Sequence, residues 1–191
     1  MLLKHGFGNV STRRIAAAAG TTPAMIHYYF GDKLGLYRAM IEGAVQPLID
    51  SVRQLEQSAG GDAPGLEDVM RAYMRMVAAN PWFPALIIRE VLDQNGRMRD
   101  EFIERFAGRT APALVGVLRR EREQGKLRVD LDPRFAAVSL LSLCVFPFVS
   151  LPITGPVLGF RPEGVELERF ISHTAQLFRE GVAARVESGH D

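Results

Sequence analysis

The segment from residue 6 to residue 37 constrains the fold most, because it holds two very short helical patterns joined by a glycine. Ser11 can accept a backbone hydrogen bond as an N-cap, and the apolar residues behind it predict a helix of about two turns over residues 12–19. Gly20 follows where a helix end needs positive φ. Thr22 and the proline after it then predict the start of a second short helix. This layout is that of a helix-turn-helix unit, which binds DNA.

The second short helix has two distinct faces when its residues are placed at about 100° per residue. One side is predicted to pack against the rest of the unit: Ile26, Tyr29 and Phe30. The opposite side is predicted to face outward: Ala24, His27 and Tyr28. A small residue, an imidazole and a phenol fit a major groove and can contact base edges or phosphates. The alternative is that they are ordinary solvated positions on a small helix pair.

A third helix is predicted to begin immediately afterwards, with Asp32 as its cap. Lys33 in its first turn is unfavourably placed for the helix dipole but well placed to bind a phosphate.

These residues resemble the TetR family of transcriptional regulators. The matching pattern covers about thirty residues: Gly6-Phe7, Ser11, Ile15-Ala16, Ala19-Gly20, Thr22, Tyr29-Phe30, Lys33 and Leu36-Tyr37. Carried over by position, the resemblance implies that Ser11, Thr22 and Lys33 bind phosphates while Ala24, His27 and Tyr28 face the bases. The predicted DNA-binding set also includes Thr12, Arg13 and Thr21.

The sequence departs from the family pattern in three places. The family commonly has tyrosine where His27 stands and glycine where Ala24 stands. The first helix of the family is represented only by residues 1–6. Since a missing first helix would remove several buried aliphatic side chains, we expect either a natural start upstream or a loosely packed head.

Charge and cysteine content narrow the function classes. Residues 1–46 carry five Lys/Arg against two Asp/Glu, and the remainder carries 18 against 20, so the predicted head is slightly basic. Chance partition of surface charge is the alternative. Cys144 lies among apolar residues and is predicted to be a buried, inert thiol in the reducing cytoplasm. The histidines are scattered, so neither a metal site nor a cofactor is expected.

The rest of the chain is predicted to be all-α. Apolar residues recur at spacings of three and four along six segments: residues 32–55, 66–77, 82–92, 102–118, 133–146 and 170–182. Pro112 is expected to kink the fourth of these helices. The head is assigned to residues 1–46, and a helical effector-binding and dimerisation body to residues 47–191.

Residues 135–160 contain no charged side chain, which raises the alternative of a membrane span. Three prolines interrupt the stretch, so a buried helix followed by a proline-rich loop is the preferred interpretation. No signal-peptide arrangement is present at the N-terminus.

Two helices of the body have more apolar surface than a small body can bury. We therefore expect a partner chain to cover them. The resemblance to the TetR family implies that this partner is a second copy, in a homodimer formed through the helices near 133–150 and 163–185. A two-fold dimer would present two recognition helices to a pseudo-palindromic operator in double-stranded DNA.

Aromatic and sulfur-bearing residues near the centre of the body could line a small-molecule pocket or form an ordinary core. The resemblance implies a pocket for a mostly apolar effector, with these candidate residues: Tyr73, Met74, Trp82, Phe83, Arg89, Phe102 and Phe106.

The sequence therefore predicts a ligand-responsive DNA-binding regulator, most simply a repressor. An enzyme is disfavoured, because serines, histidines and carboxylates fall on unrelated helices. A dimeric helical adaptor that no longer binds DNA remains the alternative.

Overall fold

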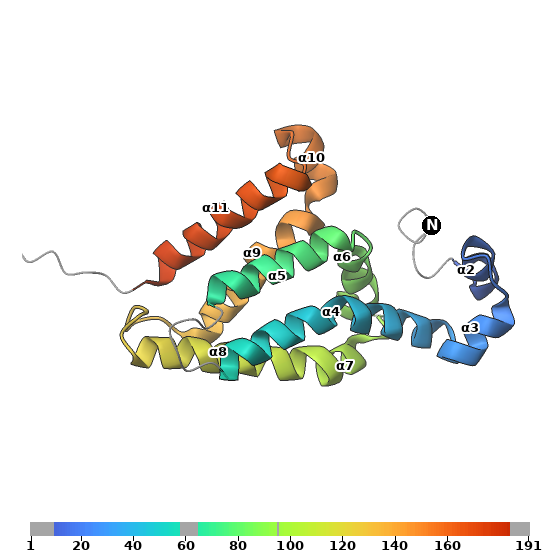
Figure 1. Cartoon of the computed structure of the whole chain (residues 1–191), viewed down its shortest axis with the longest axis horizontal. Coiled ribbons are helices and arrows are strands. Elements are labelled where there is room, and N and C mark those ends of the chain that lie inside the picture. Colours follow the sequence, from blue (N-terminus) through green and yellow to red (C-terminus); the bar gives the residue numbers. More distant parts are fainter. Residues whose placement is uncertain (1–9, 58–64, 95, 184–191) are drawn as a thin grey trace, which may run out of the picture.

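The computed structural model describes residues 10–57, 65–94 and 96–183, and the regular elements within these ranges are helices. Within these ranges there is no strand, and the one β-bridge joins Leu127 to Ala183. A small head lies at one end of a long helix, and the remaining helices gather around the other end of that helix (Figure 1). The prediction of an all-α chain with a head and a helical body is confirmed.

The head consists of α2, Thr12–Ala18, and α3, Pro23–Phe30. Both predicted caps form: the Arg14 amide donates to Ser11 Oγ (3.3 Å) and the Met25 amide to Thr22 Oγ1 (3.4 Å). Gly20 takes a φ of +64°, as the turn between the two helices requires. The two short helices thus form as the sequence predicted.

Helix α4, Lys33–Gln57, connects the head to the body. Asp32 caps it by accepting a hydrogen bond from the Gly35 amide at 2.7 Å. Its buried face begins at Tyr37 and Ile41 and continues through Leu48 and Val52. One continuous helix therefore runs from the recognition unit into the core.

The middle of the chain forms helices whose winding changes part-way. Helix α5 spans Leu66–Ala79; α6, Phe83–Leu86, continues as the π-helix η1, Ile87–Leu92. Helix α7, Arg99–Phe102, continues as the π-helix η2, Ile103–Ala107, and then as α8, Gly108–Glu123. The break in regular winding lies at η2, ahead of Pro112, which stands inside α8.

The C-terminal helices are α9, Pro133–Val149, α10, Leu151–Leu158, and α11, Gly164–Val182. The predicted proline-rich loop is wrong, because this segment forms α10. Pro152 lies in its first turn, where a missing amide hydrogen breaks no helical bond. No single described helix is long and apolar enough to cross a membrane; α9 and α10 together reach that composition but meet at a 69° bend.

The core lies where α4, α5, α8 and α9 pack together, with α11 laid across α5 and α9 (Figure 1). Its largest fully buried side chains are Tyr37, Ile41, Met70, Met74, Phe83, Leu86, Leu118, Leu140 and Ile171. Cys144 is buried among them as predicted, and burial raises the pKa of its thiol to about 12. The thiol therefore stays protonated and unreactive.

Candidate nucleic-acid interface and effector cavity

The outer face of α3 is open to solvent. Ala24, His27 and Tyr28 are all exposed, and the Tyr28 side chain is 80% exposed. Tyr28 stands edge-on to Tyr29, with 5.0 Å between the ring centroids. The described structure thus presents the imidazole and the phenol outward, where a DNA groove could reach them.

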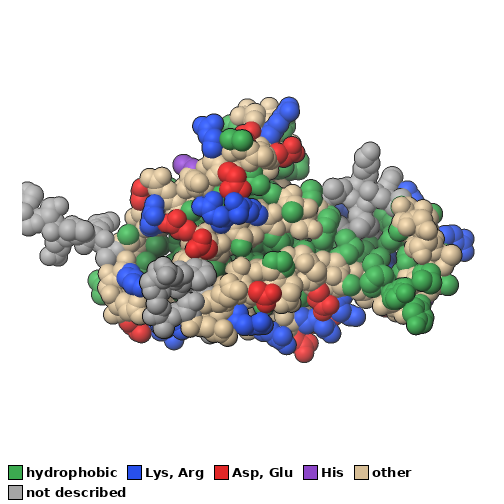
Figure 2. Space-filling model, in the orientation of Figure 1, with side chains coloured by type: hydrophobic (Ala, Val, Ile, Leu, Met, Phe, Trp, Pro, Cys, Tyr) green, Lys and Arg blue, Asp and Glu red, His purple; other side chains and the backbone are tan. Residues whose placement is uncertain are grey.

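The opposite side of α3 differs from the prediction. Ile26 is buried as expected, but Tyr29 is 66% exposed and Phe30 is also exposed. The reason is geometric: within the described residues α3 packs on α2 and α4, and these two neighbours cover only a narrow strip around Ile26. The aromatic side chains of α3 are instead exposed on the surface of the head. Figure 2 shows hydrophobic side chains gathered at this end of the molecule, at the right of the view.

His27 also has a local role. Its Nδ1 lies 2.5 Å from the carbonyl oxygen of Gly31, so the imidazole bonds to the backbone where α3 ends. This leaves Nε2 as the ring nitrogen open to an external partner.

The other predicted DNA contacts surround α3. Ser11, Arg13, Thr21 and Thr22 are exposed, and Thr12 is half-buried. Neither α2 nor α3 carries an acidic residue in its first turn. A phosphate that approaches either helix N-terminus would therefore not be repelled by a carboxylate in that turn.

Lys33 is half-buried at the start of α4, with its Nζ 5.6 Å from the centroid of the Tyr37 ring. Burial, followed by the nearby positive charge of Arg97, lowers the pKa of Lys33, while Glu90 raises it.

Glu90 connects the head end of α4 to η1. It is buried, and its Oε2 lies 3.9 Å from Nε of Arg97. Burial raises the pKa of Tyr37 to about 12, with Glu90 adding to the rise and Arg97 opposing it. The charges of Glu90 and Arg97 therefore act on Lys33 and Tyr37, in the first two turns of α4.

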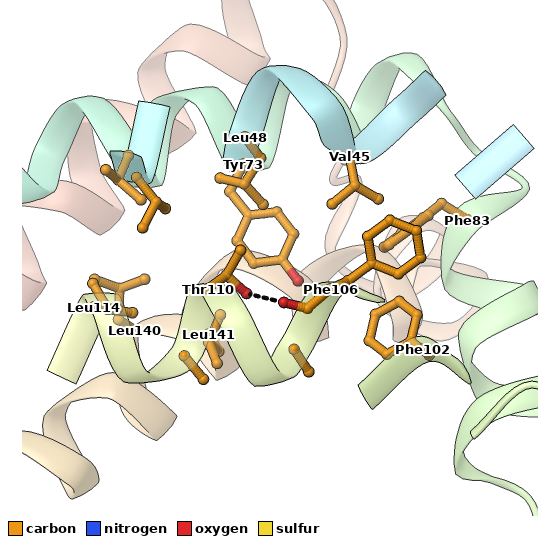
Figure 3. A pocket seen from close by; sticks show the side chains of 14 residues that line it. Val45, Leu48, Tyr73, Phe83, Phe102, Phe106, Thr110, Leu114, Leu140 and Leu141 are labelled. Carbon is orange, nitrogen blue, oxygen red and sulfur yellow. Dashed lines mark hydrogen bonds between the residues drawn. The ribbon is translucent and has the colours of Figure 1, made fainter. Parts of the chain in front are cut away.

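The body contains an apolar cavity of about 120 Å³ between α4, α5, η2, α8 and α9 (Figure 3). Its lining is almost entirely aliphatic and aromatic: Val45, Leu48, Val52, Val69, Tyr73, Phe83, Phe102, Phe106, Ala107, Thr110, Ala111, Leu114, Leu140 and Leu141. Tyr73 projects its hydroxyl toward the turn that carries Thr110 (Figure 3). The Thr110 hydroxyl donates to the Phe106 carbonyl at 3.0 Å.

A more polar groove of about 450 Å³ adjoins this cavity between α4 and α8. Its lining is Glu42, Gln46, Ile49, Val52, Arg53, Arg105, Phe106, Arg109, Thr110 and Ala113.

Two family models match the chain. One is described as bacterial regulatory proteins of the tetR family and matches residues 1–40; the other, a tetracyclin repressor-like C-terminal domain, matches residues 63–169. The chain belongs to the TetR family. It is accordingly a DNA-binding transcriptional regulator, and membership of this family implies dimerisation.

Curated relatives of this TetR-family chain are regulators of modest identity. The nucleoid occlusion factor SlmA of Pasteurella multocida is 22% identical over 142 residues, which cover 74% of this chain and 71% of that protein. The HTH-type transcriptional repressor NicS of Pseudomonas putida is 22% identical over 144 residues, covering 75% and 68%.

Solved structures show the same TetR fold. The ketosteroid regulator KstR2 of Mycobacterium tuberculosis superposes with a TM-score of 0.73 at 18% identity, covering 97% of this chain and 90% of that one. The fatty acid degradation regulator FadR of Bacillus halodurans gives 0.72 at 19% identity, covering 96% and 91%.

The predicted pocket residues separate into two groups. Tyr73, Phe83, Phe102 and Phe106 line the apolar cavity. Three others lie outside its lining: Met74, Trp82 and Arg89. Met74 is fully buried on another side of α5, Trp82 packs edge-on against Phe83 at 5.9 Å, and Arg89 is exposed on η1.

Sequence reasoning missed the aliphatic part of the lining and Thr110. It considered aromatic and sulfur-bearing side chains together with Arg89. Aliphatic residues such as Val45 and Leu140 carry the same periodic signal whether they face a cavity or a packed core. A signal for the adjoining groove was present in the sequence. Arg105 and Arg109 are four residues apart, which places them on one face of a helix, and both line the groove.

Proposed function

We propose that this TetR-family chain is a ligand-responsive repressor that binds a pseudo-palindromic operator as a homodimer. One observation carries the proposal: α4 is a single helix whose first turns hold Lys33 and Tyr37 beside the head and whose middle lines the cavity through Val45, Leu48 and Val52. A ligand that moves the cavity wall therefore moves the helix that carries the head.

We assign the head to residues 1–46 and the body to residues 47–191. Within the head, phosphates are contacted by Ser11, Thr12, Arg13, Thr21, Thr22 and Lys33. Base edges are read by Ala24, His27 and Tyr28, whose exposure on α3 supports this assignment.

The dimer forms through α9 and α11, within residues 133–150 and 163–185. The support is a set of exposed apolar side chains on these helices and on α10: Phe135, Val138, Phe146, Ile153, Val157, Leu158, Val165 and Leu177. A two-fold axis there would place the two copies of α3 about 34–36 Å apart, one turn of DNA.

The effector is a small, mostly apolar molecule bound in the cavity. Its binding shifts the spacing of the two heads and releases DNA. Repression agrees with the name of one relative, the HTH-type transcriptional repressor NicS. The protein acts in the cytoplasm and is not an enzyme.

Operator binding tests the proposal. Fluorescence anisotropy on DNA from beside the protein's own gene is expected to show specific binding. The logarithm of the binding constant should fall linearly with the logarithm of the salt concentration. Tyr28→Ala should reduce the affinity roughly 5- to 150-fold and relax sequence preference. Tyr29→Ala, which removes a neighbouring exposed ring outside the base-facing set, is the matched control and should have a smaller effect.

Absence of specific binding, with a stable dimer, would overturn the proposal in favour of a helical adaptor. Unchanged affinity and preference in Tyr28→Ala would remove the assignment of base reading to this face of α3.

A further inference from the structure

The apolar cavity and the polar groove meet, because Val52, Phe106 and Thr110 line both. One ligand can therefore occupy the two spaces together, with its apolar part inside and its polar part in the groove. Thr110 marks the neck between them.

The two volumes differ in a way that limits the ligand. A cavity of about 150 Å³ holds one benzene molecule, and the apolar cavity measures about 120 Å³. The apolar part of the ligand is therefore about one ring or a chain of roughly six carbons. The groove, at about 450 Å³, accepts a larger group.

The lining of the apolar cavity holds one side-chain hydrogen-bond donor that is not already bonded within the described ranges. Tyr73 directs its hydroxyl into the cavity (Figure 3) and forms no hydrogen bond with any residue that the structure describes. Burial, and secondarily the Cys144 thiol, raises the pKa of Tyr73, so the hydroxyl keeps its proton at physiological pH. Thr110 already donates its proton to Phe106, so a ligand acceptor such as a carbonyl would be satisfied by Tyr73.

The groove beyond the neck holds one cation without a counter-charge. Arg105 pairs with Glu42 at 3.0 Å and with Glu101 at 3.1 Å, and Arg53 pairs with Asp50 at 3.3 Å. Arg109 makes no ion pair within the described ranges, and it directly precedes Thr110 in α8. An anion in the groove would have this guanidinium as its partner.

We propose that the effector is an anionic acyl compound, with a six-carbon-sized apolar group in the cavity, a carbonyl oxygen accepting from Tyr73, and a negative charge on Arg109. This inference rests on the proposed function and names the chemistry of its ligand. A free carboxylic acid and a phosphate-bearing thioester share that chemistry.

Titration calorimetry on the full chain without DNA tests the inference with three probes: hexanoate, hexanoyl-coenzyme A and hexanol. We expect at least one acyl anion to bind roughly tenfold or more tightly than hexanol, because only the anions satisfy both polar groups. Comparison of hexanoate with the thioester identifies the source of the acyl group.

Matched variants locate the contacts. Arg109→Gln should weaken the acyl anion roughly tenfold or more, whereas Arg119→Gln, an exposed arginine farther along α8 outside the groove, should not change its affinity. Tyr73→Phe should weaken binding several-fold without lowering the melting temperature of the ligand-free protein, because the hydroxyl has no partner there.

Equal binding of hexanol, no binding of either acyl anion, or unchanged binding in Arg109→Gln would overturn the inference. Operator affinity is measured separately. If only a neutral apolar ligand releases the protein from DNA, the proposal of an acyl anion is refuted and the repressor function stands. If the protein binds an acyl anion but never binds DNA, the repressor function is refuted and the acyl-anion proposal stands.

Discussion

At the scale of single residues, Glu101 joins α7 to α4. Its carboxylate accepts hydrogen bonds from Arg38 Nε and Nη2, the latter at 3.1 Å, and it lies 3.1 Å from Arg105 Nε. These contacts lower the pKa of Glu101, with the Arg38 hydrogen bond as the largest cause and burial opposing it. The folded protein therefore favours the ionised carboxylate more than the unfolded chain does.

Replacing this carboxylate should produce a pH-dependent loss of stability. A lowered folded pKa contributes stability above the unfolded pKa of about 4.3, and the contribution is lost as pH falls through the folded value. Glu101→Gln should thus lower the free energy of unfolding at pH 7 by up to about 1 kcal/mol, the size expected for partly exposed pairs. The difference should shrink below about pH 4, as measured by urea denaturation across pH.

Glu104→Gln provides the comparison, since Glu104 is exposed on η2 and has no ion pair within the described residues. A pH-independent difference for Glu101→Gln, or an equal effect of both variants, would contradict this account of the Arg38 pair.

Residue-level prediction succeeded where the chemistry is local. Ser11, Thr22 and Asp32 act as caps because a hydroxyl or carboxylate two or three residues from an amide needs no tertiary contact. It failed for Tyr29, because whether a side chain on α3 is covered depends on which helices lie beside it. The roles of the outward residues in DNA binding remain predictions.

At the scale of elements, the junction between α3 and α4 depends on Gly35. This glycine is buried, and a Cβ at its position would overlap the carbonyl oxygen of Phe30, the last residue of α3. Any side chain there must push the end of α3 away from the first turn of α4. The angle between the recognition helix and α4 is therefore set in part by the absence of a side chain.

Gly35→Ala is expected to weaken operator binding at least tenfold, because α3 must shift relative to α4. Gly43→Ala is the matched control in the same helix: its Cβ would meet nothing within 4 Å, and it should retain affinity and gain about 1 kcal/mol of stability. Anisotropy titrations of both variants measure the effect, and equal affinities would show that the close approach at Gly35 does not position α3.

The π-helix η2 brings Phe102 and Phe106 to the cavity, and Gly108 follows it. A Cβ at Gly108 would lie 2.8 Å from the carbonyl oxygen of Ile103, whereas a Cβ at Gly116 in the same helix would meet nothing within 4 Å. Gly108→Ala should therefore lower the free energy of unfolding by about 1–3 kcal/mol. Gly116→Ala should raise it by about 0.5–1 kcal/mol.

Urea denaturation of this pair, with the ligand titration repeated on each variant, provides the measurement. Equal stabilities would mean that the turn at η2 adapts without strain.

The sequence could place a helix here but not its winding, because a π-turn leaves the apolar spacing of the segment almost unchanged. Helix α10 was missed for a related reason: prolines suggested a loop, although a first-turn proline is compatible with a helix.

At the scale of the whole molecule, the exposed apolar side chains of α9, α10 and α11 support the dimer interface proposed above. The sequence predicted excess apolar surface on two of these helices, and the structure shows it. The sequence could not show which side of α9 is covered within one chain. Leu140 and Val138 are both apolar, and only the packing of α5 and α8 against α9 buries the first and leaves the second exposed.

Val138→Arg is expected to dissociate the dimer, since it places a charge within an apolar contact. Val138 is 63% exposed on α9. The matched control is Val129→Arg, since Val129 is 90% exposed in the connection before α9, and this variant should stay dimeric. Sedimentation velocity at micromolar concentration separates the two. A monomeric wild-type protein, or a dimeric Val138→Arg, would show that this surface is not the interface.

An exposed α3, a continuous α4 and the proposed two-fold body together predict that two recognition helices read one operator. A hydroxyl-radical footprint on DNA from beside the protein's own gene tests this most directly. We predict two symmetric protected segments with centres about 10 base pairs apart on the same face of the duplex. A single protected segment, or no protection by a protein that sediments as a dimer, would contradict it.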